Sequence, residues 1–191
     1  MTNDGMTNAD DAQSGADSSF VICHLSFVIH SLAETESLGQ RLGLLLFPGA
    51  VVALNGTLGA GKTHLTRAIA EGLYVRNPMA VTSPTFGLIH EYPARLPIFH
   101  FDAYRLSGPR EFAELGSDEY LHGDGVCIIE WAEKIAEALP VEHLRIDIEP
   151  LNGESRQFTV NATGKRYERL LHDWLTTNGM LSASGQLRER V

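Results

Sequence analysis

The distribution of apolar and polar positions predicts an ordered core between two polar ends of the chain. Residues 50–55, AVVALN, form a continuous apolar run of strand length, which is typical of a parallel strand buried on both faces. After a glycine-rich segment, apolar residues recur at three- and four-residue spacing, which predicts a helix over 62–74 with one buried face. These residues are Leu65, Ala68, Ile69 and Leu73. GVCIIEW, which begins at Gly125, is a second apolar strand and ends in an acid.

The same patterns predict the other elements of the core. Further strands are expected at 26–30, in TFGLIHEY (85–92), in LPIFHFDAY (96–104), in HLRIDIEP (143–150) and in RQFTVNA (156–162). Further helices are expected over 34–46, around 109–115, over 132–138 and in the amphipathic stretch with Tyr167, Leu170, Leu171 and Trp174. The short connection at 93–97 favours an antiparallel hairpin, and the last two strands are expected to form a closing pair.

These elements predict one α/β domain with a mixed sheet over residues 26–176. Helices between strands favour a mainly parallel sheet, and the hairpins add antiparallel strands. Residues 1–18 are rich in Asn, Asp, Ser, Thr and Gly, and 1–25 is expected to be a disordered N-terminal extension. Residues 177–191 are expected to be a flexible C-terminal tail.

Composition narrows the class of protein. A chain of 191 residues, 43% of them hydrophobic, suits one domain with a substantial core. The formal net charge of -9 and the lack of a basic stripe argue against broad binding to DNA or RNA. Cys23 and Cys127 give neither a disulfide framework nor a C-x-x-C pair, which favours a cytoplasmic location. No apolar stretch suits a membrane span, and His100 and His122 lack zinc-ligand spacing, so each is expected to be a satisfied or exposed histidine.

The strongest chemical signal is GTLGAGKT, residues 56–63. Gly56, Gly61, Lys62 and Thr63 fit the pattern G-x-x-x-x-G-K-[ST], in which glycines let backbone N–H groups close around phosphate oxygens. Lys62 would reach the terminal phosphates, and Thr63 would offer its hydroxyl to Mg²⁺. The strand before the motif and the helix after it stand in the required order. The motif therefore predicts a phosphate-binding loop; the alternative is a glycine-rich turn with an ordinary solvated lysine.

Two acids end apolar strands. Asp102 closes IFHF, and Glu130 closes VCII. Glu130 follows the better buried-strand pattern and is the first candidate to hold Mg²⁺, directly or through water. Asp102 could orient water, act as a base or hold the hydration shell of the metal. Alternatively, each acid is a strand-end residue that pairs with a lysine or arginine.

Hydroxyl groups cluster in VTSPTF, residues 81–86, at Thr82, Ser83 and Thr85. We expect this segment to face the terminal phosphate, where a hydroxyl can order or release it as in nucleotide switches. An ordinary Ser/Pro turn is the alternative. Trp131, directly after the second strand-end acid, could stack on adenine or fill the core.

GTLGAGKT, SPTF, HFDAYRL, ELG (114–116) and IEWAEK, in this order, resemble the TsaE (YjeE) family of small bacterial P-loop ATPases. The resemblance runs from about Ser31 to about Leu175. It implies a P-loop NTPase-like three-layer α/β domain that uses ATP and Mg²⁺ as cofactors. It also implies a role in the biosynthesis of N6-threonylcarbamoyladenosine in tRNA. It also implies a TsaD-like transferase and a TsaB-like subunit as partners, which perform the threonylcarbamoyl transfer and through which the protein meets tRNA.

Carried over to this chain, the resemblance implies a role for each matching position. The phosphate grip would be Leu58, Gly59, Ala60, Gly61, Lys62 and Thr63, with Lys62 on the γ-phosphate. Thr63 and Glu130 would be the magnesium ligands, Asp102 would be needed for hydrolysis, Thr85 would belong to a switch-like loop, and Trp131 and Thr35 would lie near the nucleotide. Thr57 stands where the family commonly has Asp, which removes a charge beside the loop but leaves the grip intact.

The leading hypothesis is an ATPase that is weak alone and is engaged by partners. The sequence carries a phosphate-binding loop, a candidate metal site and a switch-like loop, but no evident pocket for a second substrate. A small-molecule P-loop kinase would need a lid with arginines, and the segment between Arg105 and Gly125 contains Arg110 alone. A third hypothesis is a nucleotide-gated binding module without turnover, in which Asp102 and Glu130 are structural.

Overall fold

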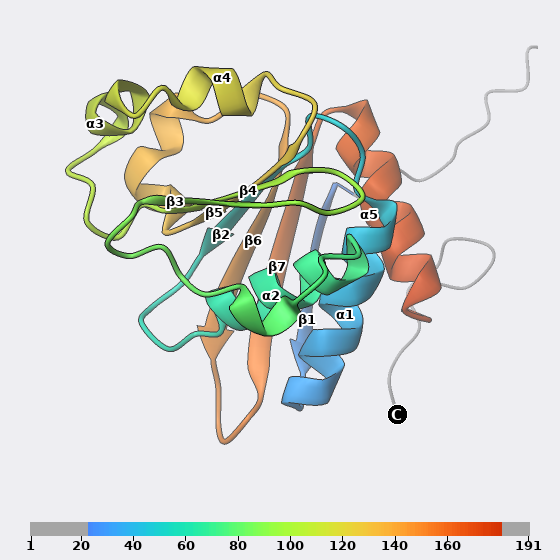
Figure 1. Cartoon of the computed structure of the whole chain (residues 1–191). Coiled ribbons are helices and arrows are strands. Elements are labelled where there is room, and N and C mark those ends of the chain that lie inside the picture. The colour runs from blue at the N-terminus through green and yellow to red at the C-terminus, as the bar shows by residue number, and fades with distance from the viewer. Residues whose placement is uncertain (1–22, 181–191) are drawn as a thin grey trace, which may run out of the picture.

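The computed structural model describes residues 23–180, which form a seven-stranded mixed sheet with helices on both faces (Figure 1). The strands are β1 (His24–Ile29), β2 (Val51–Asn55), β3 (Ile89–Tyr92), β4 (Ile98–Asp102), β5 (Val126–Glu130), β6 (His143–Pro150) and β7 (Arg156–Thr163). The helices are α1 (Leu32–Leu45), α2 (Lys62–Gly72), η1 (Pro78–Ala80), α3 (Pro109–Glu114), α4 (Ser117–Leu121), η2 (Ala132–Ala138) and α5 (Lys165–Thr177). No helix within this part of the chain is long and apolar enough to cross a lipid bilayer.

The sheet order is β1-β7-β6-β2-β5-β4-β3. Strands β6, β2, β5 and β4 run parallel at its centre, whereas β3, β7 and β1 are each antiparallel to the strand beside them. The expected α/β class and mixed sheet are therefore confirmed, as are the antiparallel pairs β3–β4 and β6–β7. Since the central strands are parallel, the carboxyl ends of β2, β4 and β5 meet at one edge, where ligands bind in open α/β sheets.

The sheet separates two hydrophobic cores because its central strands are apolar on both faces. Val52 and Leu54 of β2 belong to the core that α1, α2 and α5 cover, and Val51 and Ala53 belong to the core under α3, α4 and η2. The residues of β5 divide between the two cores in the same way. The continuous apolar runs seen in the sequence are thus explained by burial on both sides, which gives three layers.

Glycines bring α1 and α2 into close contact. A Cβ on Gly72 would lie 2.0 Å from the carbonyl oxygen of Gln40, and one on Gly43 would lie 2.2 Å from that of Ile69. No Cβ is tolerated at such distances, so these positions set the packing of α2 against α1. This packing holds the beginning of α2 at the carboxyl end of β2.

The element boundaries differ from expectation in a few places. Helix α2 ends at Gly72 and not at 74, because Tyr74 has a left-handed backbone (φ 63). The helix α4 was not expected; it follows α3 after Gly116, whose φ of 73 breaks the helix. The expected helix over 132–138 is a 3₁₀ helix.

The two ends of the chain are described in part. Strand β1 begins at His24, two residues before the strand expected at 26–30. The rest of the expected N-terminal extension, 1–22, lies outside the described residues, as does 181–191 of the expected tail. Within the described part, Met180 packs against the core beyond the end of α5.

Candidate functional site

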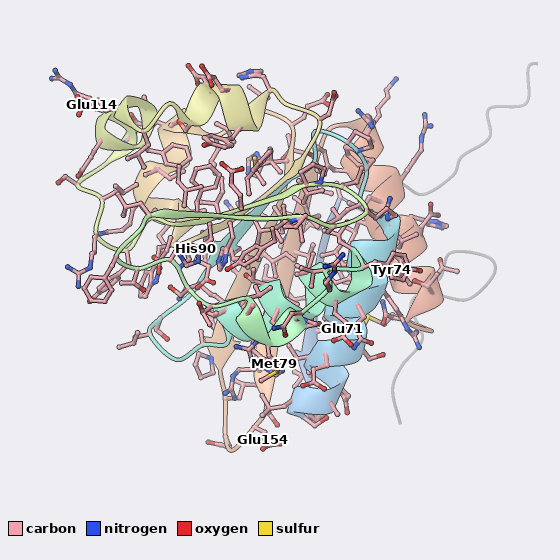
Figure 2. All side chains as sticks on the ribbon, in the orientation of Figure 1. Glu71, Tyr74, Met79, His90, Glu114 and Glu154 are labelled. Carbon is pink, nitrogen blue, oxygen red and sulfur yellow. The ribbon has the colours of Figure 1, made fainter. Side chains whose placement is uncertain are left out.

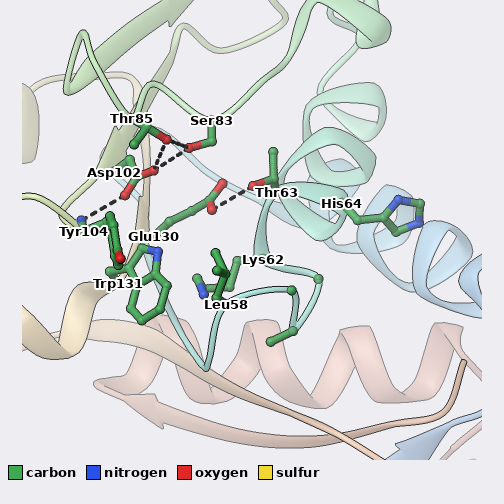
Figure 3. Close-up of a pocket in the computed structure, with 13 residues that line it drawn as sticks. Leu58, Lys62, Thr63, His64, Ser83, Thr85, Asp102, Tyr104, Glu130 and Trp131 are labelled. Carbon is green, nitrogen blue, oxygen red and sulfur yellow. Dashed lines mark hydrogen bonds between the residues drawn. The ribbon is translucent and has the colours of Figure 1, made fainter. Parts of the chain in front are cut away.

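The glycine-rich loop, residues 56–61, connects the end of β2 to the first turn of α2 (Figure 3). Its three glycines, Gly56, Gly59 and Gly61, have φ of 140, 78 and 112, which residues with a Cβ rarely adopt. Gly56 is also needed for space, because a Cβ there would lie 2.4 Å from the carbonyl oxygen of Ile148. Gly61, at the N-cap of α2, provides no side-chain cap for the N–H groups at the start of this helix. Such a loop can direct several backbone N–H groups at one anion.

Lys62, the first residue of α2, turns its ammonium group back toward the loop. Its Nζ donates to the carbonyl oxygens of Gly56 at 2.6 Å and Thr57 at 3.0 Å, and it lies 3.7 Å from the centre of the Trp131 ring. Burial lowers the pKa of this lysine below its ordinary value, while the nearby Glu130 carboxylate opposes the shift. The site therefore holds a largely buried lysine whose ammonium is bound by the loop itself.

Glu130, at the end of β5, is buried among polar partners. Its Oε2 accepts a hydrogen bond from the hydroxyl of Thr63 at 2.8 Å, and its Oε1 lies 2.8 Å from Nε2 of His100. A longer bond, 3.4 Å, joins Oε1 to the hydroxyl of Thr66. The two predicted magnesium ligands, Thr63 and Glu130, are thus in direct contact, and no lysine or arginine forms an ion pair with Glu130 within the part of the chain that the structure describes.

Asp102, at the end of β4, holds the segment with the clustered hydroxyls. Its Oδ2 accepts hydrogen bonds from the hydroxyls of Ser83 and of Thr85, the latter at 3.0 Å, and its Oδ1 accepts one from the backbone N–H of Tyr104 at 2.9 Å. The alternative of a strand-end acid paired with a basic side chain is not what is observed in residues 23–180. Asp102 instead connects β4 to the segment 82–88.

Trp131 forms one wall of the site and has an unusual backbone. Its φ of 58 is left-handed, which costs a non-glycine residue about 1 kcal/mol or more. The indole packs between the Lys62 ammonium and the Tyr104 ring, whose centre is 4.9 Å away. This backbone turns the side chain out of the β5 direction and into the site directly after Glu130.

These groups surround one cavity of about 420 Å³ (Figure 3). Its lining residues are Leu58, Gly59, Ala60, Gly61, Lys62, Thr63, His64, Ser83, Thr85, Asp102, Tyr104, Glu130 and Trp131. All residues to which the family resemblance assigns a role, except Thr35, are among them. Thr35 lies on α1, where its buried hydroxyl donates to the carbonyl oxygen of Ser31, and its assignment to the nucleotide stays a prediction.

Two residues that contact Glu130, His100 and Thr66, received no role from the sequence. His100 was expected to be satisfied or exposed; it is fully buried, and its Nε2 lies against Glu130, while its Nδ1 has no hydrogen-bond partner among residues 23–180. Its position two residues before Asp102 places both on one face of β4, which was the available signal. Thr66 reaches Glu130 from the second turn of α2, a contact that does not follow from spacing alone. Tyr104 follows Asp102 closely enough in the sequence to be expected beside the same cavity, and it lines that cavity.

The donor set suits a polyphosphate and a hard divalent cation. Thr63 and Glu130 offer a hydroxyl and a carboxylate oxygen, which are the kinds of ligand that Mg²⁺ takes from proteins while it keeps waters and phosphate oxygens. No group of three or more His, Cys, Asp or Glu side chains suited to a metal occurs within residues 23–180. The residues present thus fit a magnesium ion shared with a phosphate.

A mixed sheet with a parallel centre, in which a glycine-rich loop follows a buried strand and opens a helix, defines the P-loop NTPase-like fold. Within that class, the chain belongs to the TsaE family, because the family model described as "Threonylcarbamoyl adenosine biosynthesis protein TsaE" matches residues 29–158. The expected family and fold class are therefore confirmed.

Relatives and a solved structure agree with this assignment. The tRNA threonylcarbamoyladenosine biosynthesis protein TsaE of Bacillus subtilis is 44% identical over 141 residues, which cover 73% of this chain and 87% of the relative. The protein of the same name from Treponema pallidum is 40% identical over 70% of this chain and 97% of its own length. The crystal structure of Bacillus subtilis YdiB superimposes with a TM-score of 0.68 at 38% identity, over 81% of this chain and 96% of that one.

Proposed function

We propose that this protein binds Mg·ATP in the cavity beside the glycine-rich loop and hydrolyses it in the biosynthesis of threonylcarbamoyladenosine in tRNA. The pathway follows from family membership and from the names of the relatives. The observation that carries the chemistry is the meeting of Lys62, Thr63, Glu130 and Asp102 around one cavity.

In this proposal the loop holds the phosphate chain of ATP. The N–H groups around Gly59 and Gly61 and those at the uncapped start of α2 would donate to phosphate oxygens. Lys62 would exchange its bonds to two loop carbonyl oxygens for stronger, charge-assisted bonds to the terminal phosphates. The burial of Lys62 favours that exchange, because little water has to be removed from the ammonium.

Thr63 and Glu130 would hold the magnesium ion, directly or through its waters. When bound, the ion would neutralise charge on the phosphate oxygens and orient them for displacement. The hydroxyl of Thr63 and Oε2 of Glu130 are 2.8 Å apart, so both can turn toward one ligand. His100 occupies Oε1 and thereby leaves Oε2 as the oxygen that faces Thr63.

Asp102 would serve hydrolysis by positioning groups near the terminal phosphate. A carboxylate has about four acceptor sites, and three are used by Ser83, Thr85 and the N–H of Tyr104. The remaining site on Oδ1 can orient a water molecule. The hydrogen bonds on Oδ2 connect this acid to the segment that contains Thr85, so that binding of a phosphate would change the order of the segment.

The surface around the cavity suits a protein partner. Leu58 lies in the loop and exposes 82% of its surface, and Phe86, next to Thr85, exposes 88% and is stacked by Arg105. Large apolar side chains exposed in this way favour a protein contact. A TsaD-like transferase and a TsaB-like subunit are the expected partners; tRNA would be bound by them, since this chain carries a net charge of -9.

Phosphate release from Mg·ATP tests the proposal, measured for the protein alone and then with TsaB-like and TsaD-like partners and tRNA. We expect slow release alone and a marked rise with partners. A rate of phosphate release that is as high without the partners as with them would contradict the dependence on partners. Negligible release in every mixture would contradict hydrolysis.

One observation favours a second candidate, a nucleotide-gated binding module without turnover. Three hydrogen bonds within the protein use most of the acceptor sites of Asp102, as expected for a carboxylate that only joins two segments of the fold. In that case an Asp102→Ala variant keeps function with the partners. The small-molecule kinase finds no such support, because Arg110 is 94% exposed and pairs with Glu114.

A further inference from the structure

Arg156, the first residue of β7, joins the β6–β7 turn to the glycine-rich loop. Its Nε donates to the carbonyl oxygen of Ala60 at 3.0 Å, and its Nη1 donates to those of Ser155 at 2.9 Å and Gly153 at 3.3 Å. Glu154 marks the tip of this turn, far along the chain from the loop (Figure 2). No carboxylate forms an ion pair with Arg156 within residues 23–180. Its guanidinium therefore donates its hydrogen bonds to carbonyl oxygens of the β6–β7 turn and of the glycine-rich loop.

The contact fixes the orientation of one peptide group in the loop. In a trans peptide the carbonyl and the following N–H point in opposite directions. Because the carbonyl of Ala60 is turned to Arg156, the N–H of Gly61 points away from Arg156, on the side of the loop that leads into α2. A charge-assisted bond to the carbonyl also polarises the peptide and makes its N–H a better donor.

This peptide needs an external restraint. Gly61 has no Cβ, and, its chain neighbours aside, no heavy atom of residues 23–180 lies within 4 Å of the place where one would be, so side-chain packing does little to stop the Ala60–Gly61 peptide from rotating. Ala60 is buried, with 1% of its surface exposed, and its own N–H bonds within the loop to the carbonyl of Thr57 at 3.1 Å. Arg156 thus holds the next peptide from outside the loop.

We propose that Arg156 is a positioning residue that preorganises the glycine-rich loop for phosphate. It acts through the Ala60–Gly61 peptide and is not among the residues that line the cavity. The proposal rests on the proposed function, since it names a residue that aids the same site. Preorganisation strengthens binding because the order of the loop is established before the ligand arrives.

The test compares Arg156→Met and Arg156→Lys with a matched control, Arg166→Met. Methionine keeps much of the stem without a donor, and lysine keeps the charge without the Nε–H. Arg166 lies on α5, where it stacks on Phe47 at 3.9 Å, so its variant removes a packed guanidinium elsewhere. Calorimetric titration with ATP, ADP and adenosine gives the affinities. Hydrogen exchange of the Gly61 amide without nucleotide, with the melting temperature, reports the loop and the fold.

In both Arg156 variants we expect affinity for ATP and ADP to fall about tenfold, with adenosine affinity unchanged and faster exchange at Gly61. The Arg166 variant should match the wild type in its affinity for the two nucleotides, in its affinity for adenosine and in the exchange rate at Gly61. Equal ATP affinity and equal exchange in the Arg156 variants would overturn the proposal, even if their melting temperature fell. If the wild type bound no ATP, the proposed function would fail, and the exchange at Gly61 would still decide whether Arg156 orders the loop.

Discussion

Nε2 of His100 lies 2.8 Å from Oε1 of Glu130, and both side chains are buried, with 0% and 2% of their surface exposed. Nδ1 of His100 has no hydrogen-bond partner among residues 23–180. Assigning the hydrogen to Nε2 makes the ring a donor to Glu130 and leaves a bare nitrogen at Nδ1, which avoids an unpaired buried N–H. The contact restrains the carboxylate so that its other oxygen remains beside Thr63.

A His100→Asn variant should therefore need more magnesium to bind ATP. Groups that orient a metal ligand typically change metal affinity by about 10- to 100-fold when they are lost, so we expect the half-saturating Mg²⁺ concentration to rise at least about tenfold. Titration of Mg²⁺ into protein with ATP measures it. The control is His143→Asn, whose ring bonds to the carbonyl of Pro140 away from the cavity. An unchanged magnesium requirement would mean that His100 only fills the core.

An Asp102→Ala variant should bind ATP with about wild-type affinity, within roughly twofold, and lose hydrolysis by about 100-fold or more. The reason is that Asp102 orders the segment of Ser83 and Thr85 and can orient water, while the phosphate grip lies on α2 and its loop. Single-turnover phosphate release separates this from binding. A Thr85→Ala variant removes one of these bonds and should show a smaller loss in the same direction. Loss of ATP binding in the Asp102 variant would show that the acid holds the site together.

The sequence predicts the central part of the fold because each signal there is local. A strand buried on both faces reads as the continuous run at 50–55, and the loop glycines read as a motif because their backbone conformations exclude a Cβ. The order of β5 between β2 and β4 depends on crossovers between distant segments, which spacing along the chain does not encode. The contact of His100 with Glu130 depends on that order, and the contact of Arg156 with the loop depends on the position of β6 and β7 beside β2, so spacing alone did not identify either partner. The left-handed turn at Trp131, which brings its ring onto Lys62, has no local signal either.

A Gly72→Ala variant should be less stable although alanine is the better helix former. The propensity gain of about 1 kcal/mol is outweighed because the new Cβ would lie 2.0 Å from the carbonyl oxygen of Gln40. Separating α1 from α2 to relieve that clash should lower the free energy of unfolding by about 2–3 kcal/mol overall. Urea denaturation measures this, with Gly108→Ala as control, because a Cβ there would meet no heavy atom of the described part of the chain within 4 Å, its chain neighbours aside. Equal stability of both variants would contradict the role of Gly72 in helix packing.

A Tyr167→Phe variant tests a buried hydrogen bond between α5 and β2. The backbone N–H of Val51 donates to the phenol oxygen of Tyr167 at 2.8 Å, so its removal leaves a buried N–H unpaired and should cost about 1–3 kcal/mol. Burial raises the pKa of this phenol above its ordinary value of 10.0, so the neutral form is favoured in the folded state. The stability that the neutral phenol of Tyr167 contributes to the fold is fully present below pH 10.0 and is lost as the pH rises through the raised pKa. Urea unfolding should show this alkaline loss in the wild type and less of it in the variant; identical profiles and stabilities would contradict the assignment.

The central claim, that the cavity beside Lys62 holds Mg·ATP, is tested most directly by calorimetric titration of ATP with and without Mg²⁺. Wild type is compared with Lys62→Ala and with Lys165→Ala, which removes the same charge at the start of α5. We predict saturable, magnesium-enhanced binding at one site, weakened at least about tenfold in the Lys62 variant and unchanged in the Lys165 variant. Wild-type protein that binds no ATP, or a Lys62 variant that binds it equally well, would contradict the account.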